Sequence, residues 1–402
     1  MAASNFLTRV VLRNYKSIAA CDVRLGSLTY LVGANGSGKS NFLDALHLVR
    51  DALTGSLDNA LSERGGLSEV RRRSSGHPTH FGIRLEFRLP GGQTGHYAFN
   101  VGALKERGYE VLEEECVVDG IGKGPFFQLV RGKLKCSSEP TFPMVTSDRL
   151  ALVSASGLSV FRPVFDALTA MGFYNLNPKL IRELQKPQDG RLLKPAGENI
   201  ASVIGHLERI VPPESLNIIA EYLQTVAPMV HGVERKSIGP METLEFRQDM
   251  AGAIHPWRFL AHNMSDGTLR ALGVLTALFQ GNVDYSPSLI GIEEPETALH
   301  PAASSVLRAA LQRASEQTQV IVTSHSPDLL DDRSLNADCL LAVVADAGET
   351  RIAPLDEASR CSMRDHLFTA GELLRLNQFA PDPDVLAEQE KQQAELFGDS
   401  TQ

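Results

Sequence analysis

The segment GANGSGKS contains the residue types that bind nucleotide phosphates. Gly33, Gly38, Lys39 and Ser40 form the pattern Gly-x4-Gly-Lys-Ser. Glycines let backbone N–H groups turn toward an anion, the lysine reaches the β- and γ-phosphates, and the serine hydroxyl ligates Mg²⁺. An apolar run precedes the segment and helically spaced apolar residues follow it, as this chemistry requires. The residues predicted to contact ATP are Asn35, Gly36, Ser37, Gly38, Lys39, Ser40 and Asn41.

Adjacent carboxylates follow a second apolar run, in the segment LIGIEEPETALHP. Ionised groups at a buried strand end are costly unless something compensates for them. A nucleotide site supplies a compensating cation, because its Mg²⁺ needs an acidic group at a neighbouring strand end. We predict that Glu293 and Ser40 hold Mg²⁺ and that Glu294 orients or deprotonates the attacking water. The alternative is a solvated strand end, which the phosphate-binding pattern in the same chain disfavours.

Two further segments fit the same chemistry. The apolar run VIVT precedes His325, which we predict contacts the γ-phosphate and senses its loss. Ser265 and Gly267 stand at the start of an amphipathic helical pattern. Ser265 has a structural alternative, because serine is a common helix N-cap worth about 1 kcal/mol.

The rest of the pattern supplies the elements that position these residues. Residues 28–32 predict a buried strand, and Phe42, Leu46, Val49 and Leu53 recur at helical spacing. Residues 81–89 alternate between apolar and charged, which predicts an antiparallel strand with one solvated face, and further β segments follow. Helical spacing dominates from about residue 160, and strand–helix alternation returns after about residue 241.

Composition narrows the function classes. The 402 residues are 43% hydrophobic with a net charge of −9, so a general basic coat for nucleic acid is excluded. The five cysteines form no Cys-x-x-Cys pair, which is typical of reduced thiols in a cytosol. No apolar run approaches the roughly 20 residues of a membrane helix, and the first residues do not resemble a signal peptide. We therefore expect a cytoplasmic protein that has no membrane partner.

In their order, GANGSGKS, SDGT, EEPE, LHP and TSHSP resemble the ABC-type ATPase heads of the RecF, structural-maintenance-of-chromosomes (SMC) and overcoming-lysogenization-defect group. The stand-alone AAA ATPases of bacteria are the most similar. VVLRNYKSI resembles their entry strand and AGELLRLNQF their closing helix. The resemblance is strong over residues 6–55 and 260–330. It implies an α/β P-loop NTPase fold of the ABC-type head, with a mixed central sheet, an antiparallel β layer and a helical insert.

The resemblance also implies how such a head works. Two protomers close head to tail around two ATP molecules with Mg²⁺, so that Ser265 and Gly267 contact the γ-phosphate on the partner's loop. A homodimer or a higher even oligomer is expected, controlling a separately encoded nuclease or toxin in phage defence. The alternatives are a RecF-like or SMC-like ATPase that binds DNA in repair, and an ATP-locked scaffold without hydrolysis. A membrane-importer subunit is disfavoured, because SDGT replaces LSGGQ.

Some features of the sequence differ from the family's motifs, and one family motif is not identified in it. Glu293 replaces the usual aspartate, and the Q-loop glutamine is not placed, with Gln93 and Gln128 as candidates. No nuclease domain is expected, because the one Asp-x-Asp lies in a polar segment. Two groups of basic residues could contact nucleic-acid phosphates; the favoured alternative is that they form a solvated loop and a solvated edge. The groups are Arg64, Arg71, Arg72 and Arg73, and Arg9, Arg13 and Lys16.

We expect four regions along the chain. Residues 1–145 form an N-terminal ATPase lobe with the phosphate loop and the antiparallel β layer. Residues 146–240 form a mainly helical insert, and residues 241–380 form a C-terminal lobe with Ser265, the paired glutamates and His325. Residues 381–402 are polar and acidic, and are expected to be frayed or disordered.

Overall fold

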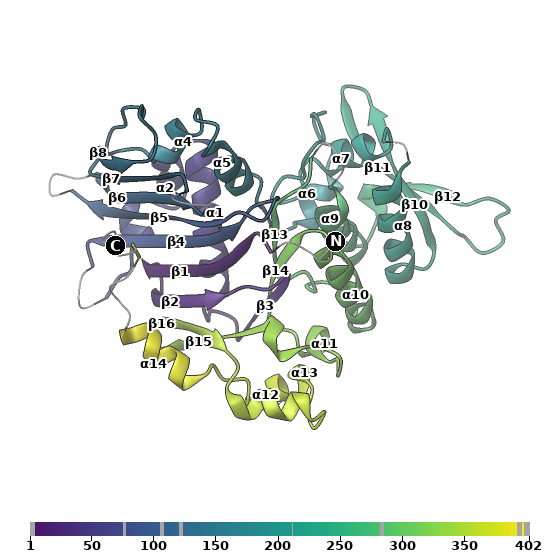
Figure 1. Cartoon of the computed structure of the whole chain (residues 1–402). Coiled ribbons are helices and arrows are strands. Elements are labelled where there is room, and N and C mark those ends of the chain that lie inside the picture. Colours follow the sequence, from purple (N-terminus) through teal and green to yellow (C-terminus); the bar gives the residue numbers. More distant parts are fainter. Residues whose placement is uncertain are drawn as a thin grey trace. The chain divides into compact units, whose positions relative to one another are not determined.

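The computed structural model describes residues 5–74, 78–104, 108–119, 124–210, 212–281, 285–391 and 396–397. The chain divides into two compact units, each of which mixes strands and helices (Figure 1). The first unit joins Met1–Met171 with Arg333–Gln402, and the second is Gly172–Asp332. These boundaries differ from the predicted ones at residues 145, 240 and 380. Each unit is described by itself.

A mixed sheet forms the first unit, in the order β8-β7-β6-β5-β4-β1-β2-β16-β15-β3. From β8 to β2 the neighbours are antiparallel, whereas β16 is parallel to β2 and β15 is parallel to β3. The antiparallel β layer and the mixed sheet are therefore confirmed. The strands are β1 (Leu7–Tyr15), β2 (Ile18–Arg24), β3 (Leu28–Val32), β4 (His80–Arg88), β5 (Thr94–Ala103), β6 (Tyr109–Val118), β7 (Phe126–Val130), β8 (Lys133–Ser137), β15 (Leu340–Asp346) and β16 (Glu349–Pro354).

The apolar patterns explain which faces are buried. All five residues of β3 are buried, as the short apolar run predicts. In β4, the apolar residues Phe81, Ile83, Leu85 and Phe87 are fully or almost fully buried, while Arg88 is exposed. An alternating strand that buries one face and wets the other is typical of an antiparallel layer.

Helices flank this sheet, and α1 (Lys39–Thr54) follows directly from the phosphate loop. Its buried residues include Phe42, Leu46, Val49 and Leu53, as helical spacing predicts. The other helices of the unit are α2 (Leu57–Ser62), α3 (Leu67–Val70), α4 (Ala151–Ala155), α5 (Arg162–Thr169), the short η3 (Ala337–Cys339), α12 (Glu357–Arg364), α13 (Ala370–Arg375) and α14 (Pro383–Lys391).

The prediction of a frayed tail is wrong for residues 383–391, which form α14. The amide of Gln389 is buried and donates to Asp22 O at 2.9 Å and to Ile352 O at 3.1 Å. Polar composition suggested disorder, but a glutamine amide can bond to strand carbonyls as well as to water. This contact fixes α14 on β2 and β16.

The second unit contains three parallel strands in the order β14-β13-β9 and an antiparallel sheet β10-β11-β12. Among its helices, α9 is apolar and buries ten consecutive residues, 269–278. Its elements are β9 (Gly172–Tyr174), α6 (Pro178–Arg182), α7 (Ile200–Leu207), α8 (Glu214–Val226), β10 (Val230–Ile238), β11 (Met241–Gln248), β12 (Trp257–Leu260), η1 (Ala261–Asn263), α9 (Asp266–Phe279), β13 (Leu289–Glu293), η2 (Pro301–Ala303), α10 (Ser304–Ser315), β14 (Gln319–Ser324) and α11 (Pro327–Leu330).

The predicted α/β class is confirmed by these two units. The region 146–240, predicted as a mainly helical insert, contains helices α4 to α8 and strands β9 and β10. Within the described ranges, no helix combines the length and the apolar character needed to cross a lipid bilayer.

Candidate functional site

The phosphate loop, residues 33–40, joins strand β3 to helix α1. Gly36 and Gly38 have φ angles of 78° and 98°, a left-handed conformation that glycine adopts without steric cost. A Cβ on Gly38 would lie 1.9 Å from Thr350 Oγ1, and one on Gly33 would lie 2.0 Å from Val343 O. The glycine positions are thus fixed by backbone angle and by lack of space, as a loop that wraps its backbone around an anion requires.

Lys39 is the first residue of α1, and it is only 4% exposed. Its ammonium donates to Gly33 O at 2.8 Å and to Ala34 O at 2.9 Å, so the cation lies over the loop. Phosphate oxygens are stronger acceptors than peptide carbonyls, because they carry charge. Asn35, Gly36 and Ser40, which belong to the same loop as Lys39, are exposed. These donors fit a nucleotide phosphate, with the Ser40 hydroxyl as an oxygen ligand for Mg²⁺.

A chain of hydroxyl groups supports the loop from β16. Thr350 Oγ1 donates to Ser37 O at 2.8 Å and accepts from Ser17 Oγ at 2.7 Å. Asn41 Nδ2 in turn donates to Ser17 Oγ at 2.6 Å. Sequence reasoning missed Thr350, which is 313 residues from Ser37 and belongs to no motif. It therefore links the C-terminal strand β16 directly to the phosphate loop.

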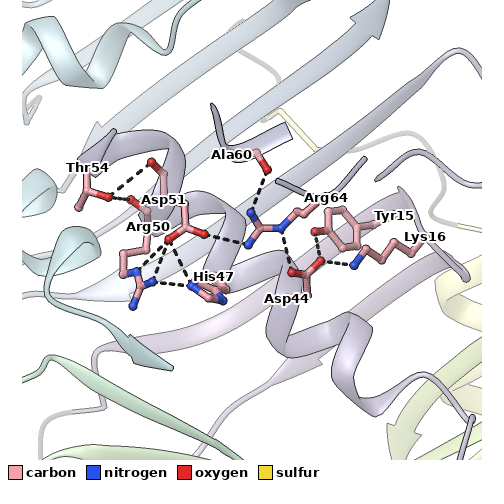
Figure 2. A network of polar contacts seen from close by, with 9 residues as sticks. All are labelled: Tyr15, Lys16, Asp44, His47, Arg50, Asp51, Thr54, Ala60 and Arg64. Carbon is pink, nitrogen blue, oxygen red and sulfur yellow. Dashed lines mark hydrogen bonds and ion pairs between the residues drawn. The ribbon is translucent and has the colours of Figure 1, made fainter. Parts of the chain in front are cut away.

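Figure 2 shows a network of ion pairs and hydrogen bonds around Asp44 and Asp51 of α1. Asp44 accepts from Tyr15, Lys16 and Arg64, at 2.7, 2.5 and 2.8 Å. Arg64 also donates to Asp51 at 2.9 Å. Burial acts to raise the pKa of the Asp51 carboxyl, but hydrogen bonds and charge from His47 and Arg50 hold that pKa well below its usual range. The helix that carries Lys39 is thereby anchored to β1 and to the segment after α2.

The two basic groups singled out in the sequence are engaged in contacts within the unit. Arg13 is 5% exposed and cannot present its charge to a partner. Arg71 donates to Pro78 O at 3.2 Å. Carboxylate partners are contacted by Arg9 (Asp22 and Glu86), Lys16 (Asp44), Arg64 (Asp44 and Asp51), Arg72 (Glu349) and Arg73 (Glu69). These contacts favour a structural role over phosphate binding. The predicted basic loop also includes residues 75–77, which lie outside the described residues.

Glu293 is the last residue of β13, and Glu294 begins the turn that follows it. Glu294 has a φ of 43°, which is unusual for a residue with a side chain. Its N–H donates to Thr323 O at 3.0 Å, and its carboxylate lies 3.1 Å from His325 Nδ1. The structure therefore brings together the predicted water-activating carboxylate and the predicted γ-phosphate sensor. Both side chains are about one-third exposed, at 35% and 38%.

Ser265 caps helix α9, and its Oγ accepts from Thr268 N at 3.2 Å. Ser265 thus has the N-cap role named above as its structural alternative. Its side chain is also exposed, at the N-terminus of a buried helix. A Cβ on Gly267 would lie 2.7 Å from Ala298 O, so the absence of a side chain lets the turn after Glu294 approach α9. Arg182 pairs with Asp266 and donates to Met264 O at 2.9 Å, which fixes the start of the helix.

Arg270, also on α9, was missed by sequence reasoning. Its guanidinium donates to Glu293 O at 3.1 Å and to Glu294 O at 2.8 Å. The available signal was a single arginine inside the apolar run LRALGVLTAL. Of the Q-loop candidates, Gln93 is exposed beyond β4, and the buried amide of Gln128 donates to Glu113 at 2.9 Å. Gln128 is therefore engaged elsewhere.

The predicted site residues are distributed over both compact units. The first unit contains the phosphate loop with Lys39, Ser40 and Asn41. The second contains Glu293, Glu294 and His325, together with the helix start at Ser265 and Gly267. Within the second unit, Glu294 and His325 are in contact, and Gly267 adjoins the turn that follows Glu294.

Comparison with known proteins finds a family model that matches part of the chain and solved structures that share its fold. The model of the family "AAA domain, putative AbiEii toxin, Type IV TA system" matches residues 28–114 and 254–331. The DNA replication and repair protein RecF of Vibrio cholerae is 37% identical over 65 residues, 14% of this chain and 18% of that protein. RecF of Vibrio atlanticus is 41% identical over 44 residues, 11% and 12% of the two chains. The chain thus spans less than a fifth of the length of these curated relatives.

Solved structures extend the likeness beyond those short stretches. The SMC head bound to the C-winged helix domain of ScpA superposes with a TM-score of 0.55 at 13% identity, covering 88% of this chain and 99% of that one. The SMC head with an extended coiled coil from Pyrococcus furiosus, bound to the C-terminal domain of ScpA, gives 0.52 at 12% identity, covering 90% and 99%. At such identities the likeness shows the fold alone, that of an SMC head. The matches to the AAA domain family and to RecF, and the likeness to SMC heads, agree with the resemblance drawn from the motifs.

Proposed function

We propose that this chain binds and hydrolyses ATP as an ABC-type ATPase. The observation that carries the proposal is the phosphate loop between β3 and α1, with Gly36 and Gly38 left-handed and the buried Lys39 ammonium over the loop. A loop of this form with a helix N-terminus behind it binds phosphate groups. The ATPase family match and the SMC-head fold support the same activity.

The chain's own residues divide the work of hydrolysis. Ser40 and Glu293 hold Mg²⁺, which neutralises charge on the phosphates when bound. Lys39 binds the β- and γ-phosphates. Glu294 orients the attacking water and takes its proton, and His325, 3.1 Å from that carboxylate, contacts the γ-phosphate. The cytoplasm, where ATP is abundant, is the proposed location.

A second copy of the chain completes the site in this proposal. Ser265 and Gly267 of one protomer contact the γ-phosphate held by the other, so two protomers close head to tail around two ATP molecules. The exposure of Ser265 at the N-terminus of α9 supports this role, because a helix N-terminus attracts anions. The assembly is then a dimer or a higher even oligomer.

The proposed output is control of a separately encoded nuclease or toxin in phage defence. The toxin named in the matching family's description supports this output. The second candidate is a DNA-binding ATPase of the RecF or SMC type, favoured by the match to RecF. The carboxylate partners of Arg9 and Arg72, whose side chains are partly buried, count against direct DNA binding through the two basic groups. A third candidate, an ATP-locked scaffold, keeps the same ATP site but does not hydrolyse.

Two substitutions test the ATPase proposal. Lys39→Ala removes a charge-assisted bond to phosphate, so we expect ATP affinity to fall about a hundredfold, roughly 3 kcal/mol. Glu294→Gln keeps the shape of the site, so we expect normal ATP binding and phosphate release slower by about 10²–10⁴-fold. Titration with a fluorescent ATP analogue and a phosphate-release assay measure both quantities. Lys135→Ala, an exposed lysine on β8, is the control for lost charge.

The outcomes separate the candidates. Normal ATP affinity in Lys39→Ala would contradict the phosphate-loop assignment. Full biological activity in Glu294→Gln, with hydrolysis abolished, would favour the scaffold. The ATP-trapped Glu294→Gln protein, isolated from its native cell, then identifies the partner. A copurifying nuclease or toxin supports effector control, whereas DNA without a protein partner supports the RecF-like candidate.

A further inference from the structure

Arg270 is a buried cation inside an apolar helix. It is 7% exposed and lies on α9 among the buried residues 269–278. Its Nη2 donates to Glu293 O and Glu294 O, and its Nη1 donates to Leu176 O. Burial lowers the pKa of Arg270, and the negative charges of Glu296, Glu294 and Glu293 oppose that shift. A buried charge is costly, so these backbone contacts have to offset a large desolvation penalty.

The contacts of Arg270 enclose the backbone of Glu294. Glu293 O and Glu294 O belong to the two peptide groups on either side of the Glu294 Cα. Fixing both groups fixes the backbone angles between them, and Glu294 is held at a φ of 43°. A left-handed non-glycine residue costs about 1–3 kcal/mol and persists only when its surroundings enforce it. Arg270, together with the Glu294 N–H bond to Thr323 O, supplies that enforcement.

We propose that Arg270 is a positioning residue through which the helix that begins at Ser265 holds the water-activating Glu294 in place. The proposal rests on the function proposed above. Arg270 follows Ser265, the N-cap of α9, by five positions, which is a rise of about 7.5 Å along the helix axis. A displacement of the helix start on phosphate binding is therefore transmitted through Arg270 to the backbone of Glu294 in the same protomer. This contact makes hydrolysis at a protomer's own nucleotide depend on the nucleotide held by the other protomer.

Substitution by methionine tests this role. Arg270→Met keeps a long side chain, and apolar replacement of buried charged groups is often tolerated by the fold. We expect the Kd for ATP to stay within about twofold and kcat to fall about 10–100-fold, because a small misplacement of a catalytic group slows chemistry by that factor. Arg270→Lys retains a donor for one carbonyl and is expected to recover part of the loss.

A matched control distinguishes positioning from stability. Thr276 lies on the same helix, is fully buried and donates to Leu272 O at 2.8 Å. Thr276→Val removes a buried hydrogen bond without touching Glu294, so we expect it to change the melting temperature but not kcat. Hydrogen exchange at residues 293–297, measured without nucleotide, is expected to accelerate in Arg270→Met and to remain unchanged in Thr276→Val.

Two different failures can be told apart. If wild-type protein does not hydrolyse ATP, or if Glu294→Gln hydrolyses it normally, the proposed function is wrong. If Glu294→Gln is inactive but Arg270→Met matches the wild-type kcat and exchange rate, the role of Arg270 is overturned. A double variant, Ser265→Arg with Arg270→Met, adds a test of coupling. Its loss is expected to be no larger than the greater single loss, whereas multiplied losses contradict a shared path.

Discussion

Thr350 illustrates, at the scale of single residues, how a position outside every motif supports the proposed nucleotide site. Its hydroxyl bridges Ser37 O and Ser17 Oγ, and its side chain fills the space that a Cβ on Gly38 would need. The residues of the phosphate loop are recognisable because their spacing is local. Thr350 and Arg270 are not recognisable, because each acts on backbone carbonyls, which have the same chemistry at every residue.

Replacing Thr350 by valine keeps its shape and removes its hydroxyl. Ser37 O loses a donor and Ser17 loses an acceptor, and leaving buried polar groups unpaired costs about 1–3 kcal/mol. We expect ATP affinity to fall about tenfold, measured by titration with the fluorescent analogue. The matched control is Thr54→Val, which removes an exposed hydroxyl bonded to Arg50 O at the end of α1. Equal affinity in the two variants would show that the hydroxyl chain does not support the loop.

At the scale of elements, hydrophobic periodicity predicts the helices and strands that are held in place by their own apolar residues. Helix α1, strand β3 and strand β4 bury the apolar positions that the sequence indicates. Helix α14 escapes prediction because Gln389, a polar residue, makes the contact that fixes it. The contact between β6 and α4 is likewise not predictable from periodicity, because a polar residue makes it. Buried Glu114 on β6 accepts from the N–H groups of Ala151 and Leu152 at the start of α4.

Glu114 makes stability depend on pH. Burial raises the pKa of its carboxyl from 4.5 to about 7, although hydrogen bonds from Ala151, Leu152 and Tyr97 act to lower it. Because the folded pKa is the higher one, this group's contribution is fully present below pH 4.5 and is lost as pH rises through about 7. The loss is about 3 kcal/mol. We expect Glu114→Gln, which stays neutral, to flatten the free energy of unfolding measured by urea titration between about pH 5 and pH 8. Parallel pH profiles for the two proteins would contradict this assignment.

At the scale of the whole molecule, the comparisons show the fold of an SMC head, and the assembly of two copies is a proposal. Ser265 lies in one compact unit and Lys39 in the other. The sequence motifs identify Ser265 and Lys39 as phosphate-binding candidates, but they do not tell whether the two residues bind the same phosphate or phosphates held by different copies of the chain. Oligomeric behaviour has to be measured.

A bulky cation at the helix start tests assembly. In the Glu294→Gln background, ATP is expected to convert monomers to dimers, measured by light scattering after size-exclusion chromatography. Adding Ser265→Arg is expected to leave ATP binding by the monomer intact and to prevent that conversion, because the side chain occupies the space of the partner's phosphate. Ser154→Arg, exposed on α4, is the control. Unimpaired dimers with Ser265→Arg would refute the composite site.

The sheet order of the first unit has a consequence for synthesis on the ribosome. Strand β3, which precedes the phosphate loop, pairs with β15, and β16 lies between β15 and β2. The ribosome makes the loop early, whereas the Thr350 hydroxyl that supports it follows Ser37 by 313 residues. Until that hairpin emerges, the nascent chain exposes the edges of β2 and β3, which are sites of mispairing for any unfinished sheet. A chain cut short by a premature stop codon is therefore a target for chaperones and proteases, whatever motifs it contains.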